Sequence, residues 1–154
     1  NGGTLYRPQV IEKITSVDGT VLEQFEPEVL NEIPASAETL EAVKLGMELV
    51  IRDERGTAYN RFKGMGTPVF GKTGTATTSV EDPHSWFAGF TDANNPDKPD
   101  IAVAVILEYA GDGSAYAAPV FRCVIEAYFA GEGYTQFWWE WDIYITRTPA
   151  PDTE

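Results

Sequence analysis

Apolar side chains in the first third of the chain follow two different spacings. Residues 9–25 carry short apolar stretches on either side of Asp18-Gly19, a pair that favours a tight turn between antiparallel strands. This segment is therefore predicted to be a β-hairpin, and the acidic stretch from Pro27 to Pro34 a linker. In residues 37–52 the apolar positions lie three and four apart, which predicts a helix with Ser36 as its N-cap.

Strands are predicted in the middle of the chain. Gly56 and its polar neighbours are expected to end the first helix, and a short helical turn is expected at residues 58–62. The turn residues 94–97 favour an antiparallel connection between the strands on either side of them. The last strand is almost wholly apolar, which predicts that both its faces are covered. Three stretches are predicted to be strands: residues 69–78, 86–90 and 101–109.

A second helix is predicted over residues 115–130, and Gly131 is well placed to end it. Cys123 lies within the apolar stripe of this helix and is predicted to be a buried structural thiol rather than a nucleophile. The stripe expected to face the core consists of Tyr116, Val120, Cys123, Val124, Ala127 and Tyr128.

The end of the chain is rich in aromatic residues. Residues 131–146 are predicted to be a strand-like extension, and residues 147–154 a flexible tail. Within the extension, positions 139, 141, 143 and 145 would share one apolar face. That face is expected to pack on its own domain, and the alternative is a docking surface for another segment or for a partner.

Composition and charge narrow the classes of protein. The 154 residues suit one soluble domain and include no apolar run long enough to cross a membrane. A net charge of -13 argues against nucleic acid as a partner and mildly against polyphosphate ligands. One cysteine excludes an internal disulfide and a cysteine metal cluster. Because the chain opens on Asn1 without an initiator Met, it is expected to be a piece of a longer protein.

The candidate chemistry lies in residues 71–76, Gly-Lys-Thr-Gly-Thr-Ala, which can be interpreted in two ways. Residues 66–73 fit the phosphate-loop formula G-x-x-x-x-G-K-[ST]. However, Pro68 has no N–H, and Val69 and Phe70 resist the positive φ that a phosphate loop needs. The residues after Thr73 also favour a strand over the required helix. A nucleotide site is therefore the weaker interpretation.

The second interpretation is a serine acyl-transfer site with residues 72–74 on a strand. Lys72 and Gly74 would then point to one face, so that the Lys72 ammonium stands beside a serine nucleophile. Thr73 offers a hydroxyl to a substrate carboxylate, and the backbone N–H of Thr75 is a candidate oxyanion donor. An open strand edge would also bind an extended peptide.

Four segments of the chain resemble one family. Residues 71–76 are similar to the K-T-G motif of penicillin-recognising serine acyltransferases, and residues 84–90 to the strand that follows it. Residues 1–8 and 46–58 resemble other parts of the same domain, in family order. The chain therefore resembles, over about residues 1–130, the C-terminal part of the transpeptidase domain of a class B, monofunctional penicillin-binding protein.

This resemblance implies an α/β fold of the α+β type, with an antiparallel sheet flanked by helices. It implies a D,D-transpeptidase that cross-links peptidoglycan stem peptides through a serine acyl-enzyme and binds β-lactams. Lys72 and Thr75 are expected to be catalytic, and Thr73, Gly74 and Thr77 to bind substrate. It also implies a location on the outer face of the cytoplasmic membrane, with an upstream anchor, and further cell-wall synthesis proteins as partners. No cofactor is expected.

The family's other two motifs, S-x-x-K and S-x-N, do not occur in the 154 residues. The nucleophile is therefore expected on an upstream half of the same domain, and this chain alone is expected to be inactive. A serine β-lactamase or β-lactam sensor is the main alternative, followed by a nucleotide-binding domain and a non-catalytic module. His84 is expected to be structural, because neighbouring Ser85 points to the opposite strand face and no metal-ligand partner lies at suitable spacing.

Overall fold

The computed structural model describes residues 2–79, 82–133 and 135, and it divides into two compact units, residues 1–44 and 45–154. The first unit contains two short antiparallel ladders. The predicted turn is present, since Gly19 has a φ of 88° and the Ser16 amide donates to the Thr20 carbonyl at 2.8 Å. The four strands are β1 (Thr4–Tyr6), β2 (Lys13–Thr15), β3 (Val21–Gln24) and β4 (Val29–Glu32), with β1 paired to β4 and β2 to β3.

Strand β4 corrects one prediction. The stretch between Pro27 and Pro34 is not a linker, because Val29–Glu32 pairs with β1. Its composition is acidic, but Val29 and Leu30 favour extended backbone, and the Arg7 guanidinium holds the Glu28 carboxylate at 2.6 Å beside the ladder. The predicted β-hairpin at 9–25 is confirmed as the β2–β3 ladder.

Helix α1 (Ala37–Arg52) has the predicted bounds. The Thr39 amide donates to the Ser36 hydroxyl at 3.2 Å, so Ser36 is the N-cap as the sequence predicts. The helix is followed by a tight turn at Gly56. A side chain there would meet the Leu49 and Val50 carbonyl oxygens at 2.4 Å, so only glycine fits against the end of α1.

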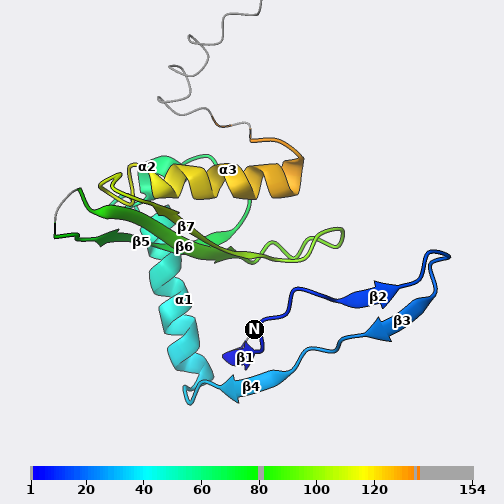
Figure 1. The fold of residues 1–154 in the computed structure, drawn as a ribbon. Coiled ribbons are helices and arrows are strands. Elements are labelled where there is room, and N and C mark those ends of the chain that lie inside the picture. The colour runs from blue at the N-terminus through cyan, green and yellow to red at the C-terminus, as the bar shows by residue number, and fades with distance from the viewer. Residues whose placement is uncertain (1, 80–81, 134, 136–154) are drawn as a thin grey trace, which may run out of the picture. The chain divides into compact units, whose positions relative to one another are not determined.

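The second unit is a three-stranded antiparallel sheet with two helices on one face (Figure 1). Phe87, fully buried on the central strand, stacks on Phe62 with ring centroids 5.3 Å apart and contacts Phe121 at 4.7 Å. These contacts attach the helices to the sheet. The elements are α2 (Tyr59–Phe62), β5 (Val69–Ala76), β6 (His84–Thr91), β7 (Ala102–Leu107) and α3 (Ala117–Ala130).

The three strands and the antiparallel turn are confirmed, but the predicted cover on both faces of the last strand is wrong for the described part of the chain. Val105 is buried on β7, whereas Ala102, Ala104 and Ile106, which alternate with it, are exposed. Helices α2 and α3 cover only one face of the sheet, so the side chains on the other face of β7 stay exposed although they are apolar.

Helix α3 ends as predicted at Gly131, which has a φ of 91° and donates its amide to the Ala127 carbonyl. Its predicted buried face is largely wrong, although Val120 does pack against the core. Ala118, Phe121 and Ile125 are buried together with Arg122 and Glu126, while Val124 is exposed and Cys123 is half-buried. The charged pair was the reason for the error, because charged residues normally mark the solvent side of a helix.

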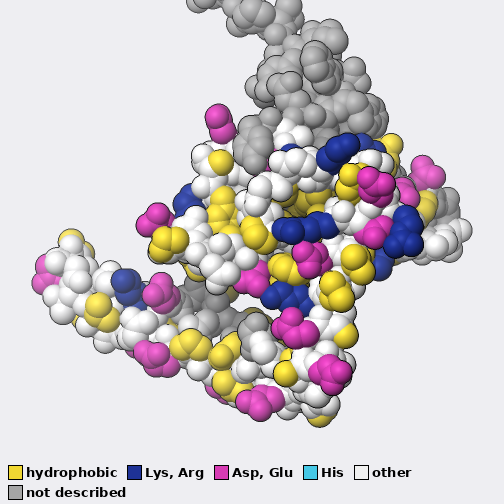
Figure 2. Space-filling model, turned by 180° about the vertical axis from the view of Figure 1, so that it is seen from behind, with side chains coloured by type: hydrophobic (Ala, Val, Ile, Leu, Met, Phe, Trp, Pro, Cys, Tyr) yellow, Lys and Arg dark blue, Asp and Glu magenta, His cyan; other side chains and the backbone are white. Residues whose placement is uncertain are grey.

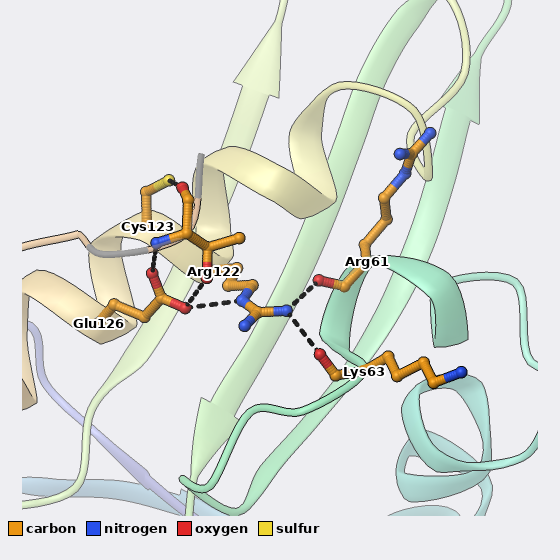
Figure 3. Close-up of polar contacts among 6 residues, drawn as sticks. Arg61, Lys63, Arg122, Cys123 and Glu126 are labelled. Carbon is orange, nitrogen blue, oxygen red and sulfur yellow. Dashed lines mark hydrogen bonds and ion pairs between the residues drawn. The ribbon is translucent and has the colours of Figure 1, made fainter. Parts of the chain in front are cut away.

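Arg122 and Glu126 form an ion pair in the interior, with the guanidinium Nε 2.7 Å from the carboxylate and side-chain exposures of 8% and 0%. The guanidinium also donates to the carbonyls of Arg61 and Lys63, at 2.8 and 3.1 Å (Figure 3). The Thr135 amide donates to the same carboxylate at 2.9 Å. Burial alone would raise the pKa of Glu126, but these hydrogen bonds from Thr135 and Arg122 outweigh it and lower the pKa.

Acidic side chains are spread over the face seen in Figure 2, with Lys and Arg standing among them rather than gathered in one basic patch. In the part of the chain that the structure describes, no helix is long and apolar enough to cross a membrane. Within the predicted aromatic extension at 131–146, residues 134 and 136–146 lie outside the described residues, as does the predicted tail at 147–154.

The buried ion pair yields a stability prediction. Glu126→Ala should lower the free energy of unfolding by about 3–5 kcal/mol, because it leaves the Arg122 charge buried without its partner. Glu48→Ala is the matched control: Glu48 forms an exposed pair with Arg52 at the same helix spacing, 3.3 Å apart, and its loss should cost under about 1 kcal/mol. Urea unfolding measures both, and equal losses would contradict the role of burial.

Candidate active site

Strand β5 is the outer strand of the described sheet and pairs with β6 along one edge. The ladder begins where the Asp92 amide donates to the Pro68 carbonyl at 3.2 Å. Hydrogen-bonded and non-hydrogen-bonded pairs alternate along an antiparallel ladder, so the backbone groups of Lys72 and Gly74 point toward β6. Those of Thr73 and Thr75 therefore point to the open edge.

The β6–β7 ladder supports this assignment. The Thr91 amide donates to the Ile101 carbonyl at 3.0 Å. The backbone N–H and C=O of Thr91 therefore point toward β7 and away from Val69, its register partner in β5. The alternation along β5 is thereby fixed from both sides of β6. The Thr75 N–H at the open edge is thus free of any ladder partner among the described strands.

Two glycines, Gly71 and Gly113, allow close packing around this strand. A side chain on Gly71 would meet the Phe87 ring at 2.5 Å, so glycine allows the core ring to pack directly under the strand. Across Gly74 lies Gly113, and a side chain on Gly113 would meet the Gly74 and Trp86 carbonyl oxygens at 2.3 and 2.4 Å. The loop before α3 therefore rests directly on the backbone of β5 and β6.

Lys72 is exposed, and its ammonium donates to the Thr73 carbonyl at 2.6 Å. It borders a hollow of about 390 Å³ together with Asp53, Arg55 and Thr57. Arg55 holds the pKa of Asp53 at about 2, first through its side-chain hydrogen bonds and then through its backbone amide. Among the described residues, Asp53 is therefore paired with Arg55 and not with Lys72.

Lys72 also borders a second, apolar hollow of about 410 Å³ on the sheet face opposite α2 and α3. Ala88 is the register partner of Lys72, and its small side chain leaves space beside the lysine. The other lining residues are Met47, Gly89, Phe90, Ala102, Val103 and Ala104. Apart from Lys72, the residues that line this hollow carry no charge, so the ammonium at its rim can approach a ligand without a competing charge from the lining.

Thr73 is half-buried, and its hydroxyl lies 2.8 Å from the hydroxyl of Thr57. Thr57 was not among the residues singled out from the sequence. The only signal was its place in residues 46–58, which resemble the family but gave no chemical role. Thr75 is exposed on the strand, and Thr77 is exposed just beyond its end. The structure thus brings Lys72, Thr73, Gly74 and Thr75 together on one edge strand, with Thr77 next to it.

The remaining polar groups nearby have structural partners. His84 Nδ1 accepts the Tyr109 amide at 3.0 Å, and the two rings lie 4.7 Å apart. The buried Ser85 hydroxyl donates to the Asp112 carbonyl at 3.0 Å and accepts the Ala117 amide at 3.0 Å. A triad of His84 and Ser85 is therefore absent, as the sequence predicts. Among the described residues, no group of three acidic, His or Cys side chains is arranged to hold a metal.

A phosphate loop does not form. Residues 69–76 are strand β5, and β6 follows in antiparallel pairing, so no helix begins after Thr73 to present its N-terminus to a phosphate. Strand β5 instead presents an exposed lysine, a threonine and outward backbone groups at an open edge. Such an edge suits recognition of an extended, carboxylate-bearing peptide.

Comparison with known proteins agrees with this geometry. The family model described as the penicillin binding protein transpeptidase domain matches residues 1–126, and the chain therefore belongs to that family. The expected class of penicillin-binding protein is confirmed. The chain is similar to peptidoglycan D,D-transpeptidase MrdA of Haemophilus influenzae, with 32% identity over 146 residues, 83% of this chain and 21% of that protein. It is also similar to peptidoglycan D,D-transpeptidase PbpA of Mycobacterium tuberculosis, with 33% identity over 86% of this chain and 27% of that protein.

Solved structures confirm the predicted fold class. Penicillin-binding protein A from Mycobacterium tuberculosis, as an imipenem acyl-enzyme complex, matches with a TM-score of 0.62 and 30% identity, over 82% of this chain and 27% of that one. Penicillin-binding protein 2B from Streptococcus pneumoniae matches in fold with a TM-score of 0.68 and 22% identity, over 89% of this chain and 24% of that one. The chain thus spans about a quarter of the length of the relatives it matches.

The close approach of Gly113 to β5 is testable. Gly113→Ala should lower the free energy of unfolding by about 1–3 kcal/mol, because its methyl group displaces the loop from the Gly74 and Trp86 backbones. Gly66→Ala is the control, since nothing lies within 4 Å of the added atom there, and its effect should stay within about 0.5 kcal/mol. Thermal unfolding of both variants checks the difference, and a neutral Gly113→Ala would refute the contact.

Proposed function

We propose that this chain forms one wall of the active site of a peptidoglycan D,D-transpeptidase that is also acylated by penicillin. The observation that carries the proposal is the edge of β5. There the exposed ammonium of Lys72 stands next to outward backbone groups of Thr73 and Thr75. The names of the relatives, peptidoglycan D,D-transpeptidases and penicillin-binding proteins, support the same chemistry.

The nucleophile of this proposal is a serine outside these residues, because S-x-x-K does not occur in the chain. Its oxygen bonds to the carbonyl carbon of the penultimate D-Ala of a stem peptide. The C–N bond then breaks, and the terminal D-Ala leaves with the proton that the serine gave up. An amine of a neighbouring stem attacks the resulting ester, forms the new peptide bond and returns the proton to the serine.

Lys72 has two roles in this scheme. Its ammonium attracts the substrate carboxylate, which is important on a chain with a net charge of -13. It also assists proton transfer at the serine from the open face of β5. The free approach of this group is supported by its exposure and by the engagement of nearby Asp53 with Arg55.

The substrate is proposed to bind as an added strand on the open edge of β5. Thr73 donates its hydroxyl to the carboxylate of the terminal D-Ala, and Thr77 contacts the substrate beyond the strand end. Gly74 leaves space for the segment that carries the serine. The outward N–H of Thr75 donates to the oxyanion that forms when the carbonyl carbon becomes tetrahedral. The upstream half of the domain, a membrane anchor and cell-wall synthesis partners complete the proposal.

The role of Lys72 predicts a kinetic effect. In the full-length protein, Lys72→Ala should slow acylation by a fluorescent penicillin by about 10²–10⁴-fold, since it removes the proton-transfer group. Lys13→Ala, which removes an exposed lysine from β2, is the control and should label at the wild-type rate. Labelling followed over time on a gel measures both rates. An unchanged rate for Lys72→Ala would contradict the assignment, and rapid loss of label from the wild type would indicate a β-lactamase instead.

The role of the Thr75 N–H yields a second test. Thr75→Pro removes that N–H and should slow acylation by about 10²–10³-fold, as removal of an oxyanion donor does. The ladder should survive, because the Thr75 N–H faces the open edge, where proline is tolerated. Thr75→Ala keeps the N–H and should stay near the wild-type rate. If both variants are slowed alike, the side chain and not the N–H is responsible.

A further inference from the structure

Thr57 contributes a hydroxyl to the proposed site from outside strand β5. Its Oγ1 lies 2.8 Å from Oγ1 of Thr73, at hydrogen-bond distance for two hydroxyls. Thr57 also lines the same hollow of about 390 Å³ as Lys72. Thr57 therefore contacts Thr73 and also borders the hollow next to Lys72, although it lies 16 residues from Thr73 in the sequence.

The turn that carries Thr57 is fixed on both sides. Gly56 packs so closely on the Leu49 and Val50 carbonyls that no side chain fits there. On the other side, Ala58 is fully buried and donates its amide to the Val50 carbonyl at 3.0 Å. Thr57, between them, is exposed but cannot move far without breaking one of these contacts. Its hydroxyl is thus presented to Thr73 by a rigid backbone.

The direction of this hydrogen bond decides what Thr73 can do. Each threonine hydroxyl has one proton to donate, and a carboxylate can only accept. If Thr73 gives its proton to Thr57, none is left for a substrate carboxylate. If Thr57 donates to Thr73, the Thr73 proton is free to point away, and the two bonds in series strengthen each other.

We propose that Thr57 is a positioning residue that donates to Thr73 and so turns the Thr73 hydroxyl into a donor for the substrate's carboxylate. The inference rests on the proposed function and extends it by one residue. Thr57 does not touch the substrate itself, and its effect is confined to substrates that carry the carboxylate. This selectivity separates positioning from a general role in folding.

The test uses the full-length protein and two probes, benzylpenicillin and its methyl ester, in which the carboxylate is masked. The second-order rate of acylation is measured for each, and the ratio of the two rates reports recognition of the carboxylate. Thr57→Val, which keeps the shape and removes the hydroxyl, should lower this ratio about tenfold by slowing benzylpenicillin alone. Thr57→Ser retains the hydroxyl and should keep the wild-type ratio. Thr57→Ala replaces the valine variant if that variant does not fold.

A second background tests whether Thr57 acts through Thr73. In Thr73→Val the acceptor is gone, so adding Thr57→Val should leave the ratio unchanged. Equal slowing of both probes in Thr57→Val, or no change in either, would overturn the inference. An additive effect in the Thr73→Val background would overturn it too. A wild-type protein that benzylpenicillin does not acylate at all would instead refute the proposed function.

Discussion

The packing of Phe87 is the contact on which the second unit depends. Its ring lies between the sheet and the helices, stacked on Phe62 of α2 and packed on Phe121 of α3. The ring also reaches the backbone of Gly71, where no side chain would fit. Burial of an aromatic side chain is one of the largest single apolar contributions to a small core. Phe87 therefore contacts both helices and the backbone of β5, and it fixes the distance between them.

Because Phe87 faces Thr73 across the β5–β6 ladder, the core and the proposed site share the same strand positions. Alternation along β5 sends Gly71 and Thr73 toward the helix side, and Lys72 and Gly74 to the opposite face. The ladder also sends the backbone groups of Thr75 to the open edge. The chemistry thus follows from register: a shift by one residue would bury the lysine and turn the outward N–H groups inward.

Local patterns were enough to predict most elements but few of the contacts between them. Helix α1 was predicted from its apolar spacing and from Ser36, and the end of α3 from Gly131, since these signals lie within one turn of the helix. Strand β4 was missed because its partner β1 lies more than 20 residues away in the sequence. The K-T-G motif was visible as residue letters, but the outward direction of the Thr75 N–H follows only from the ladder. Thr57 was missed for the same reason, since its contact with Thr73 is tertiary.

The central claim is that this chain supplies the β5 wall of an acyl-transfer site whose serine lies elsewhere in the protein. The most direct measurement is mass-spectrometric mapping of the penicillin adduct after proteolysis of the acylated full-length protein. The adduct should lie on a serine of an S-x-x-K sequence outside these 154 residues, none of which forms that motif. An adduct on Ser16, Ser36, Ser79, Ser85 or Ser114 would contradict the account.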